Sequence, residues 1–170
     1  MAESPSVKFL GLLRTLLRHG VDFFVVGGVA AQLAGAPILT LDLDVVYDKA
    51  PDNLGRLLAA LRELNARYRD PAGRHIEPDM AKLETLRLHL LLTDLGALDI
   101  LGVIGDGLTY QDLLGRTVSY QLGEARIRVL ELAAVIETKE YANRDKDRAV
   151  LPVLRQTLAL KAESGQDEER

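Results

Sequence analysis

The chain has 170 residues, no cysteine and a formal net charge of −4. This length suits one domain with a hydrophobic core, and the lack of cysteine excludes disulfides and thiolate metal sites. Three widely spaced histidines, His19, His75 and His89, show no zinc-ligand pattern. The mild charge argues against a general electrostatic grip on nucleic acid, and no apolar stretch reaches the roughly 18–20 residues that span a bilayer. We therefore expect a cytoplasmic protein with no membrane association.

The first half of the chain predicts strands alternating with helices. Apolar residues recur at helical spacing up to His19 and Gly20, which suit the end of a helix. A β-branched and aromatic run is typical of a buried strand, and Pro51 suits the first turn of an amphipathic helix. In chain order we expect helix, strand, short helix, strand and helix over residues 7–19, 23–26, 29–34, 43–47 and 51–64.

The second half predicts hairpins followed by helices. A polar stretch broken by prolines at 67–79 is typical of a loop, and turn residues at 94–96 and 123–124 favour hairpins. We expect four strands over residues 86–93, 98–104, 118–122 and 125–129, and a helical turn over 110–114. Two helices follow over residues 132–141 and 148–160. The order predicts an α+β fold, a small mixed sheet flanked by helices, in one domain over 1–160 with a disordered acidic tail over 161–170.

Two carboxylates, Asp42 and Asp44, lie inside an otherwise apolar segment. Residues i and i+2 of a strand point to the same face, so these charges repel each other unless something positive lies between them. A divalent cation such as Mg²⁺ suits them, because it prefers oxygen ligands and leaves positions for phosphate. Taken alone, however, a D-x-D pattern is more often a surface pair that flanks a loop and caps a turn.

A glycine pair, Gly27 and Gly28, stands between the first predicted strand and the short helix. Glycines let the backbone approach a ligand closely, and the N–H groups at a helix start favour phosphate. A plain tight turn is the alternative. The pair belongs neither to a Walker loop nor to a G-x-G-x-x-G motif.

Asp99 is a third carboxylate, placed within an apolar predicted strand. A buried aspartate without a partner is costly, so we expect it to have one. If its strand neighbours the Asp44 strand, Asp99 completes a triad and serves as a metal ligand or general base. The alternative is a simple pairing with an arginine.

Lys139, Asn143 and Lys146 are spaced by four and three residues, so a continuous helix would place them on one face. Lysines on such a face could hold a triphosphate. The alternative is a solvated charged face in which residues 144–147 form a ladder of ion pairs within the helix.

Together, these features resemble the signature of the DNA polymerase β-type nucleotidyltransferase superfamily: a glycine pair, a spacer of thirteen residues, then D-x-D between hydrophobic residues. The matching positions are Gly27, Gly28, Asp42, Leu43, Asp44 and Val45. Asp99 corresponds to the superfamily's third carboxylate. A later run is similar to a helix of small prokaryotic AbiEii-type nucleotidyltransferases, through Lys139, Ala142, Arg144, Lys146 and Asp147.

The resemblance implies a nucleotidyltransferase that moves a nucleoside monophosphate from an NTP to a hydroxyl of RNA, such as tRNA, or of protein. Asp42, Asp44 and Asp99 would hold one or two Mg²⁺ ions, with Mn²⁺ as an alternative, and Asp99 would deprotonate the acceptor. The implied nucleotide-binding residues are Gly27, Gly28, Lys139 and Lys146. The resemblance also implies a toxin–antitoxin or phage-defence component with a cognate antitoxin or other partner protein.

Gly28 is a departure from the family pattern, because many active members have serine there and use its hydroxyl on phosphate. The chain also lacks an extra helical domain that would select an acceptor. Both departures favour an alternative function, a non-catalytic module that binds a partner protein, whereas the three aspartates favour the enzyme. A structural protein with a fortuitous D-x-D is the remaining alternative.

Four arginines are candidates for binding an anionic acceptor: Arg67, Arg69, Arg74 and Arg87. Their positions in and near the predicted loop favour solvated charges over an acceptor site.

Overall fold

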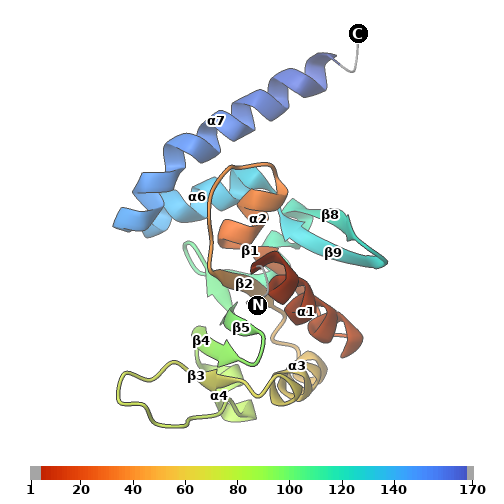
Figure 1. Ribbon diagram of the computed structural model, residues 1–170, viewed down its shortest axis with the longest axis vertical. Coiled ribbons are helices and arrows are strands. Elements are labelled where there is room, and N and C mark those ends of the chain that lie inside the picture. Colours follow the sequence, from red (N-terminus) through yellow and green to blue (C-terminus); the bar gives the residue numbers. More distant parts are fainter. Residues whose placement is uncertain (1–4, 168–170) are drawn as a thin grey trace.

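A mixed seven-stranded sheet forms the centre of the computed structural model, which describes the backbone of residues 5–167 (Figure 1). Its strands are β1 Phe23–Val26, β2 Asp42–Tyr47, β3 Arg67–Tyr68, β4 Leu88–Thr93, β5 Gly96–Leu101, β8 Thr117–Leu122 and β9 Ala125–Leu130. Their order across the sheet is β3-β4-β5-β2-β1-β9-β8. The pairs β2–β5 and β1–β9 are parallel and the others antiparallel. The predicted α+β fold with a small mixed sheet is confirmed.

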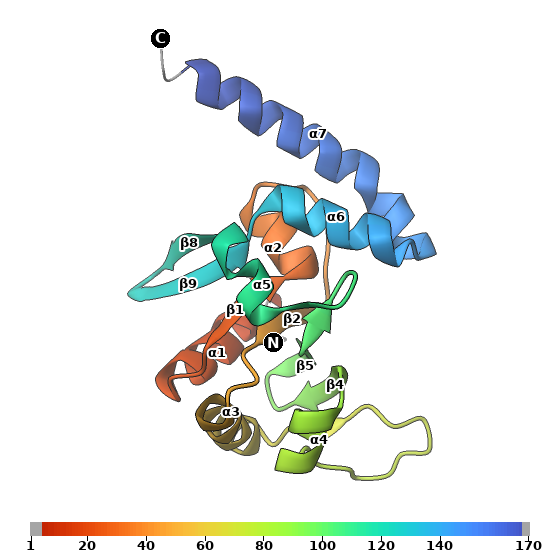
Figure 2. The same ribbon diagram turned by 180° about the vertical axis from the view of Figure 1, so that it is seen from behind.

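Helices cover the sheet on both faces. They are α1 Pro5–Arg18, α2 Gly27–Leu33, α3 Pro51–Glu63, α4 Met80–Thr85, α5 Tyr110–Leu113, α6 Leu132–Ala142 and α7 Asp145–Asp167. Helix α2 contacts β1, β2 and α6, while α3 contacts α1 and α4. A small two-stranded sheet, β6 Val103–Ile104 and β7 Leu108–Thr109, follows β5. Figure 2 shows α2 and α6 in the upper part of the molecule, near β8 and β9, and α3 and α4 at its lower end, near β4.

Strand β2 connects the core to the polar face. Leu43, Val45 and Tyr47 are fully buried, whereas the alternate residues Asp42 and Asp44 face the other side and are partly exposed. The period of two in a strand therefore separates the core from the charges. A sheet anchored on one face by this packing gives the carboxylates a fixed backbone.

The structure bears out the two expected C-terminal helices and moves their bounds. Helix α6 ends at Ala142, its cap residue Asn143 adopts a left-handed conformation with φ of 50°, and α7 begins at Asp145. Lys139 and Lys146 therefore lie on two helices, and the condition of one continuous helix that would place them on one face is not met. Helix α7 also continues to Asp167, where we had expected disorder from 161; residues 168–170 lie outside the described part.

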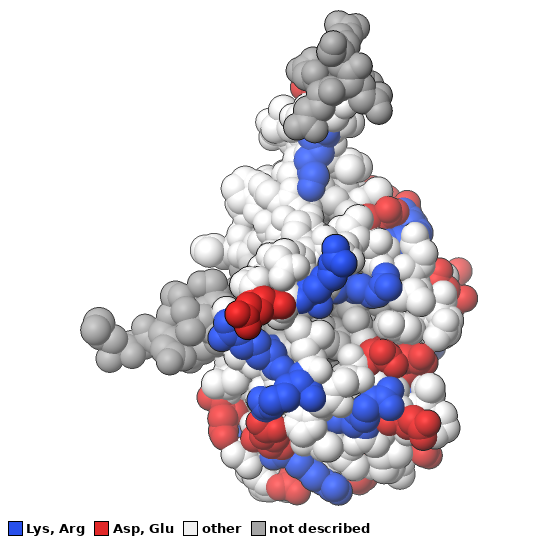
Figure 3. Space-filling view, turned by 90° about the vertical axis from the view of Figure 1, so that its right-hand side faces the viewer, with Lys and Arg blue, Asp and Glu red and all other residues white. Residues whose placement is uncertain are grey.

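No helix in the described range is long and apolar enough to cross a membrane. Figure 3 shows one side of the molecule, where acidic and basic side chains are interspersed and neither sign covers the surface. This face offers no broad basic stripe of the kind that tracks a nucleic-acid backbone.

Candidate active site

The sheet register places two of the predicted aspartates side by side. Strands β2 and β5 pair in parallel, and Asp44 is directly opposite Asp99. Asp42 points to the same face from β2, two residues before Asp44. The strand adjacency that the sequence analysis required for a triad is therefore present.

A cavity of about 590 Å³ opens over these strands, between the sheet and the junction of α6 and α7. Its volume falls in the usual range for a small-molecule site. All seven residues predicted for metal and nucleotide binding line it: Gly27, Gly28, Asp42, Asp44, Asp99, Lys139 and Lys146. The structure thus gathers one set of side chains from β2, β5, α2, α6 and α7.

The carboxylates in this cavity carry unbalanced charge. Burial raises the pKa of Asp44 to about 7, and the nearby charges of Asp99 and Asp42 add to the effect. Burial also raises the pKa of Asp99, against the opposing influence of Arg69. A bound cation would favour the charged form of this carboxyl, against the burial and the acidic neighbours that raise its pKa.

Arg69 is the basic residue that sequence reasoning placed wrongly. We expected a solvated loop charge, but its guanidinium forms an ion pair with Asp99 and lies 3.7 Å from Asp42. Among the described residues, its buried Nε–H finds no hydrogen-bond acceptor. The other three candidates behave as expected: Arg67, Arg74 and Arg87 are exposed, and Arg74 pairs with Asp70 beside the loop.

A buried hydrogen-bond chain holds the strand that precedes Arg69. Tyr47 donates its hydroxyl to the Leu83 carbonyl and accepts from Nε2 of His89, while Tyr68 donates to Nδ1 of His89. This order fixes one neutral tautomer of the imidazole. Burial, with the charge of Lys49, lowers the pKa of His89 to about 4, so the ring stays neutral.

The donor set of the cavity fits Mg²⁺. Carboxylate oxygens are the ligands that this ion prefers, and burial together with neighbouring carboxylates raises the pKa of both Asp44 and Asp99, a shift that a bound cation would oppose. In the described part of the chain, however, no three acidic or histidine side chains converge on a single metal position. Instead, the Arg69 guanidinium contacts both Asp99 and Asp42.

The two glycines are needed for different reasons. Gly27 has a positive φ of 64°, and a Cβ there would strike the Asp44 carboxylate. At Gly28, a Cβ would lie only 2.7 Å from Oγ1 of Thr40. A serine at 28 thus has no room while Thr40 stays in place. Thr40 lines the same cavity, and its hydroxyl donates to the Asp42 carbonyl at 3.2 Å. The sequence analysis missed Thr40, whose only signal is a hydroxyl two residues before Asp42.

The opposite wall of the cavity is a paired network at the α6–α7 junction. Asp147 is fully buried and accepts from Arg144 Nε at 2.7 Å, with Lys139 Nζ at 3.5 Å. Burial opposes the charged form, but the bonds from Arg144 and the charge of Lys139 outweigh it and lower the pKa of Asp147. The alternative interpretation, a ladder of ion pairs over residues 144–147 within one helix, is met only in part: Arg144 precedes α7, and the pair within α7 joins Asp145 to Arg148.

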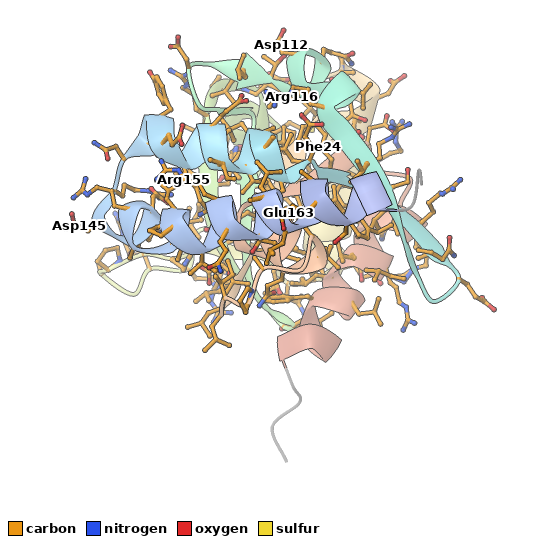
Figure 4. The ribbon with its side chains drawn as sticks, turned by 90° about the horizontal axis from the view of Figure 1, so that it is seen from above. Phe24, Asp112, Arg116, Asp145, Arg155 and Glu163 are labelled. Carbon is orange, nitrogen blue, oxygen red and sulfur yellow. The ribbon has the colours of Figure 1, made fainter. Side chains whose placement is uncertain are left out.

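Helices α6 and α7 lie side by side above the sheet (Figure 4). Arg155 of α7 lies next to α6 and pairs with Glu140 at 2.8 Å. This ion pair joins α6 to α7 and so helps to hold Lys139 and Lys146, which lie on these two helices, at the cavity.

No family model matches the chain, and no curated protein matches it. Solved structures do. The lincosamide antibiotic adenylyltransferase LnuA, bound to lincomycin, has a TM-score of 0.61 at 12% identity over 88% of this chain and 96% of its own. The antibiotic-resistance factor ANT(2'')-Ia in complex with adenylyl-2''-tobramycin has a TM-score of 0.58 at 16% identity over 95% and 94%.

A Thermotoga maritima protein assigned to the nucleotidyltransferases is a further match, with a TM-score of 0.51 at 18% identity over 95% of this chain and 94% of its own. The identities are low, so these likenesses speak for the fold. The chain has the nucleotidyltransferase fold.

Proposed function

We propose that the protein is a Mg²⁺-dependent nucleotidyltransferase that moves a nucleoside monophosphate from an NTP to an acceptor hydroxyl. One observation carries the proposal: Asp42, Asp44 and Asp99 line one cavity of this fold together with Lys139 and Lys146. Carboxylates on one side and ammonium groups on the other suit a metal-bound triphosphate.

In this proposal, Asp42, Asp44 and Asp99 would hold Mg²⁺, or Mn²⁺ in its place. When bound, the ion would supply charge neutralisation for the triphosphate. Lys139 and Lys146 bind the phosphates electrostatically, and the backbone at Gly27 and Gly28 allows them to approach closely.

Asp99 is the proposed general base, since it lies next to Asp44 and its raised pKa favours uptake of a proton. It takes the proton from the acceptor hydroxyl. The acceptor oxygen then forms a bond to the α-phosphorus as the bond to the bridging oxygen breaks. Pyrophosphate leaves with that electron pair.

The acceptor class is part of the proposal. The family resemblance suggests RNA, such as tRNA, or a protein, and a cognate antitoxin or other partner in a toxin–antitoxin or phage-defence system. LnuA, by contrast, is an antibiotic adenylyltransferase, which adds small molecules to the acceptors worth testing. Leu88 and Leu90 line the cavity and are 47% and 41% exposed, so an acceptor with an apolar part would fit beside Asp99.

The experiment is a transfer assay. The protein is incubated with Mg²⁺, each α-labelled NTP in turn, and total RNA, a protein extract or a set of antibiotics as acceptors. Label transfer by wild type but not by Asp44→Asn supports the proposal. A protein that binds neither Mg²⁺ nor any NTP in calorimetry contradicts it.

A second candidate function is a non-catalytic module that keeps the fold and binds a partner protein. The position of Arg69 favours it, because a guanidinium already pairs with Asp99 and approaches Asp42, two of the carboxylates that a metal would need. In that case the partner would be captured equally by wild type and by Asp44→Asn, with no label transferred.

A further inference from the structure

Arg69 bridges two of the three carboxylates in the cavity, and its contacts suggest what happens when a metal binds. Its guanidinium pairs with Asp99 and approaches Asp42, both of which are proposed metal ligands. A divalent ion and this guanidinium need the same carboxylate oxygens. Because positive charges repel at such a distance, both cannot hold the aspartates together.

The side chain of Arg69 does not satisfy all of its hydrogen-bond donors. Its Nε–H is buried and, within the described residues, lacks an acceptor. An unmade hydrogen bond in a buried place costs free energy, which withdrawal of the side chain would recover. The Arg69 side chain is still 31% exposed, so it has a route to solvent.

The backbone of Arg69, in contrast, is fixed. Its N–H donates to the Leu90 carbonyl at 3.0 Å, and the preceding Tyr68 is bonded to the buried His89. Leu90 is also the strand partner of Asp99. The guanidinium can therefore swing away by rotation about its own side-chain bonds, while β3 and the aspartates stay in place.

We propose that Arg69 is an internal counter-ion that competes with the divalent cation for Asp99 and Asp42, so that metal binds as the guanidinium withdraws. The inference rests on the proposed function. It assigns Arg69 a positioning role: it keeps the metal-free carboxylates together and lowers the apparent metal affinity. It also accounts for three aspartates that share a cavity without converging, among the described residues, as a metal site.

Mn²⁺ serves as the probe, and electron paramagnetic resonance of the free ion measures its binding to the full-length protein without nucleotide. Arg69→Gln removes the competing charge and keeps a polar side chain. We expect Arg69→Gln to bind Mn²⁺ at least about tenfold more tightly than wild type, because no guanidinium has to leave the carboxylates before the ion binds. Arg74→Gln, in the exposed loop after β3, is the matched control and should leave the affinity unchanged.

Thermal melting gives a second readout. In EDTA, Arg69→Gln should melt below wild type, because Asp99 and Asp42 lose their counter-ion. Saturating Mn²⁺ should raise its Tm by more than that of wild type. Should Arg69→Gln fail to fold, the Nε–H resonance of Arg69 in the wild type, assigned with Arg69→Lys, is followed during Mg²⁺ titration and should shift.

Equal or weaker Mn²⁺ binding by Arg69→Gln overturns the counter-ion role, as does an Nε–H resonance that saturating Mg²⁺ leaves in place. If Mn²⁺ binding and label transfer persist without any dependence on Arg69, the inference alone fails. If wild type and Arg69→Gln both bind no Mn²⁺, the metal-dependent function fails with it. Asp44→Asn gives the reference for a disabled site.

Discussion

The two walls of the cavity treat buried charge in opposite ways. The helix wall consists of Lys139, Arg144 and Asp147, and its buried carboxylate is paired with two cations and has a lowered pKa. The sheet wall consists of Asp42, Asp44, Asp99 and Arg69, with three carboxylates for one guanidinium. Here the pKa of Asp44 is raised to about 7. The buried carboxylate of the helix wall is therefore already paired with cations, whereas the carboxylates of the sheet wall would be stabilised by a further cation.

The sheet wall should matter for chemistry far more than for stability. We expect Asp44→Asn to lower nucleotidyl transfer by about 10³-fold or more, since it removes a proposed metal ligand. The free energy of unfolding in EDTA should not fall, because the substitution removes one of several like charges. Label transfer and urea unfolding measure the two effects. Asp52→Asn, exposed in the first turn of α3, should leave the activity unchanged.

In the helix wall, Asp147 should matter for stability. Asp147→Asn leaves Lys139, only 16% exposed, without its carboxylate, so we expect a loss of about 2–3 kcal/mol in the free energy of unfolding. Asp145→Asn is the control at the same helix start. Its pair with Arg148 is exposed and should contribute less than about 0.5 kcal/mol. Equal losses from the two variants, measured by urea unfolding, would remove the distinction between a structural and an incomplete wall.

The pH dependence of the metal-free protein separates the walls by sign. Asp44 has a pKa raised from 3.8 to about 7 in the folded state, so between these values the folded protein holds the extra proton. The contribution of Asp44 therefore falls as the pH rises through this window. Asp147, with its lowered pKa, contributes fully above its ordinary pKa and loses this contribution as the pH falls below it.

Urea unfolding in EDTA tests this sign. Between about pH 5 and about pH 7.5, wild type should lose about 1–2 kcal/mol relative to Asp44→Asn, and Mg²⁺ should restore part of it at the higher pH. Parallel pH profiles of unfolding free energy for the two proteins would show that Asp44 makes no such pH-dependent contribution.

Sequence patterns predicted the parts of the site that follow from local geometry. Asp42 and Asp44 were expected on one face because a strand has a period of two, and Asp99 was expected to join them if its strand neighboured theirs, which the register shows. Arg69 was named as a candidate, but its contact with the aspartates was missed, because it depends on β3 pairing with β4, where Arg67 is opposite Leu92. The break between the last two helices was expected over residues 142–147, whereas the left-handed residue at which it occurs, Asn143, leaves no periodic signal.

Thr40 offers the smallest and most local test, because it decides whether the sheet wall lacks a hydroxyl at all. Gly28→Ser should cost about 1–2 kcal/mol of unfolding free energy, since its Cβ meets Thr40 Oγ1 at 2.7 Å. Adding Thr40→Ala should recover most of this loss, giving a coupling energy above about 0.5 kcal/mol in a double-mutant cycle. The transfer assay then compares NTP binding in two backgrounds. If one hydroxyl, at residue 28 or residue 40, is enough, Thr40→Val should weaken NTP binding when residue 28 is glycine. It should leave NTP binding unchanged when residue 28 is serine. Additive losses of unfolding free energy in the double-mutant cycle would mean that Thr40 does not take the position of the family's serine. In that case the loop at Gly28 would lack a hydroxyl for phosphate.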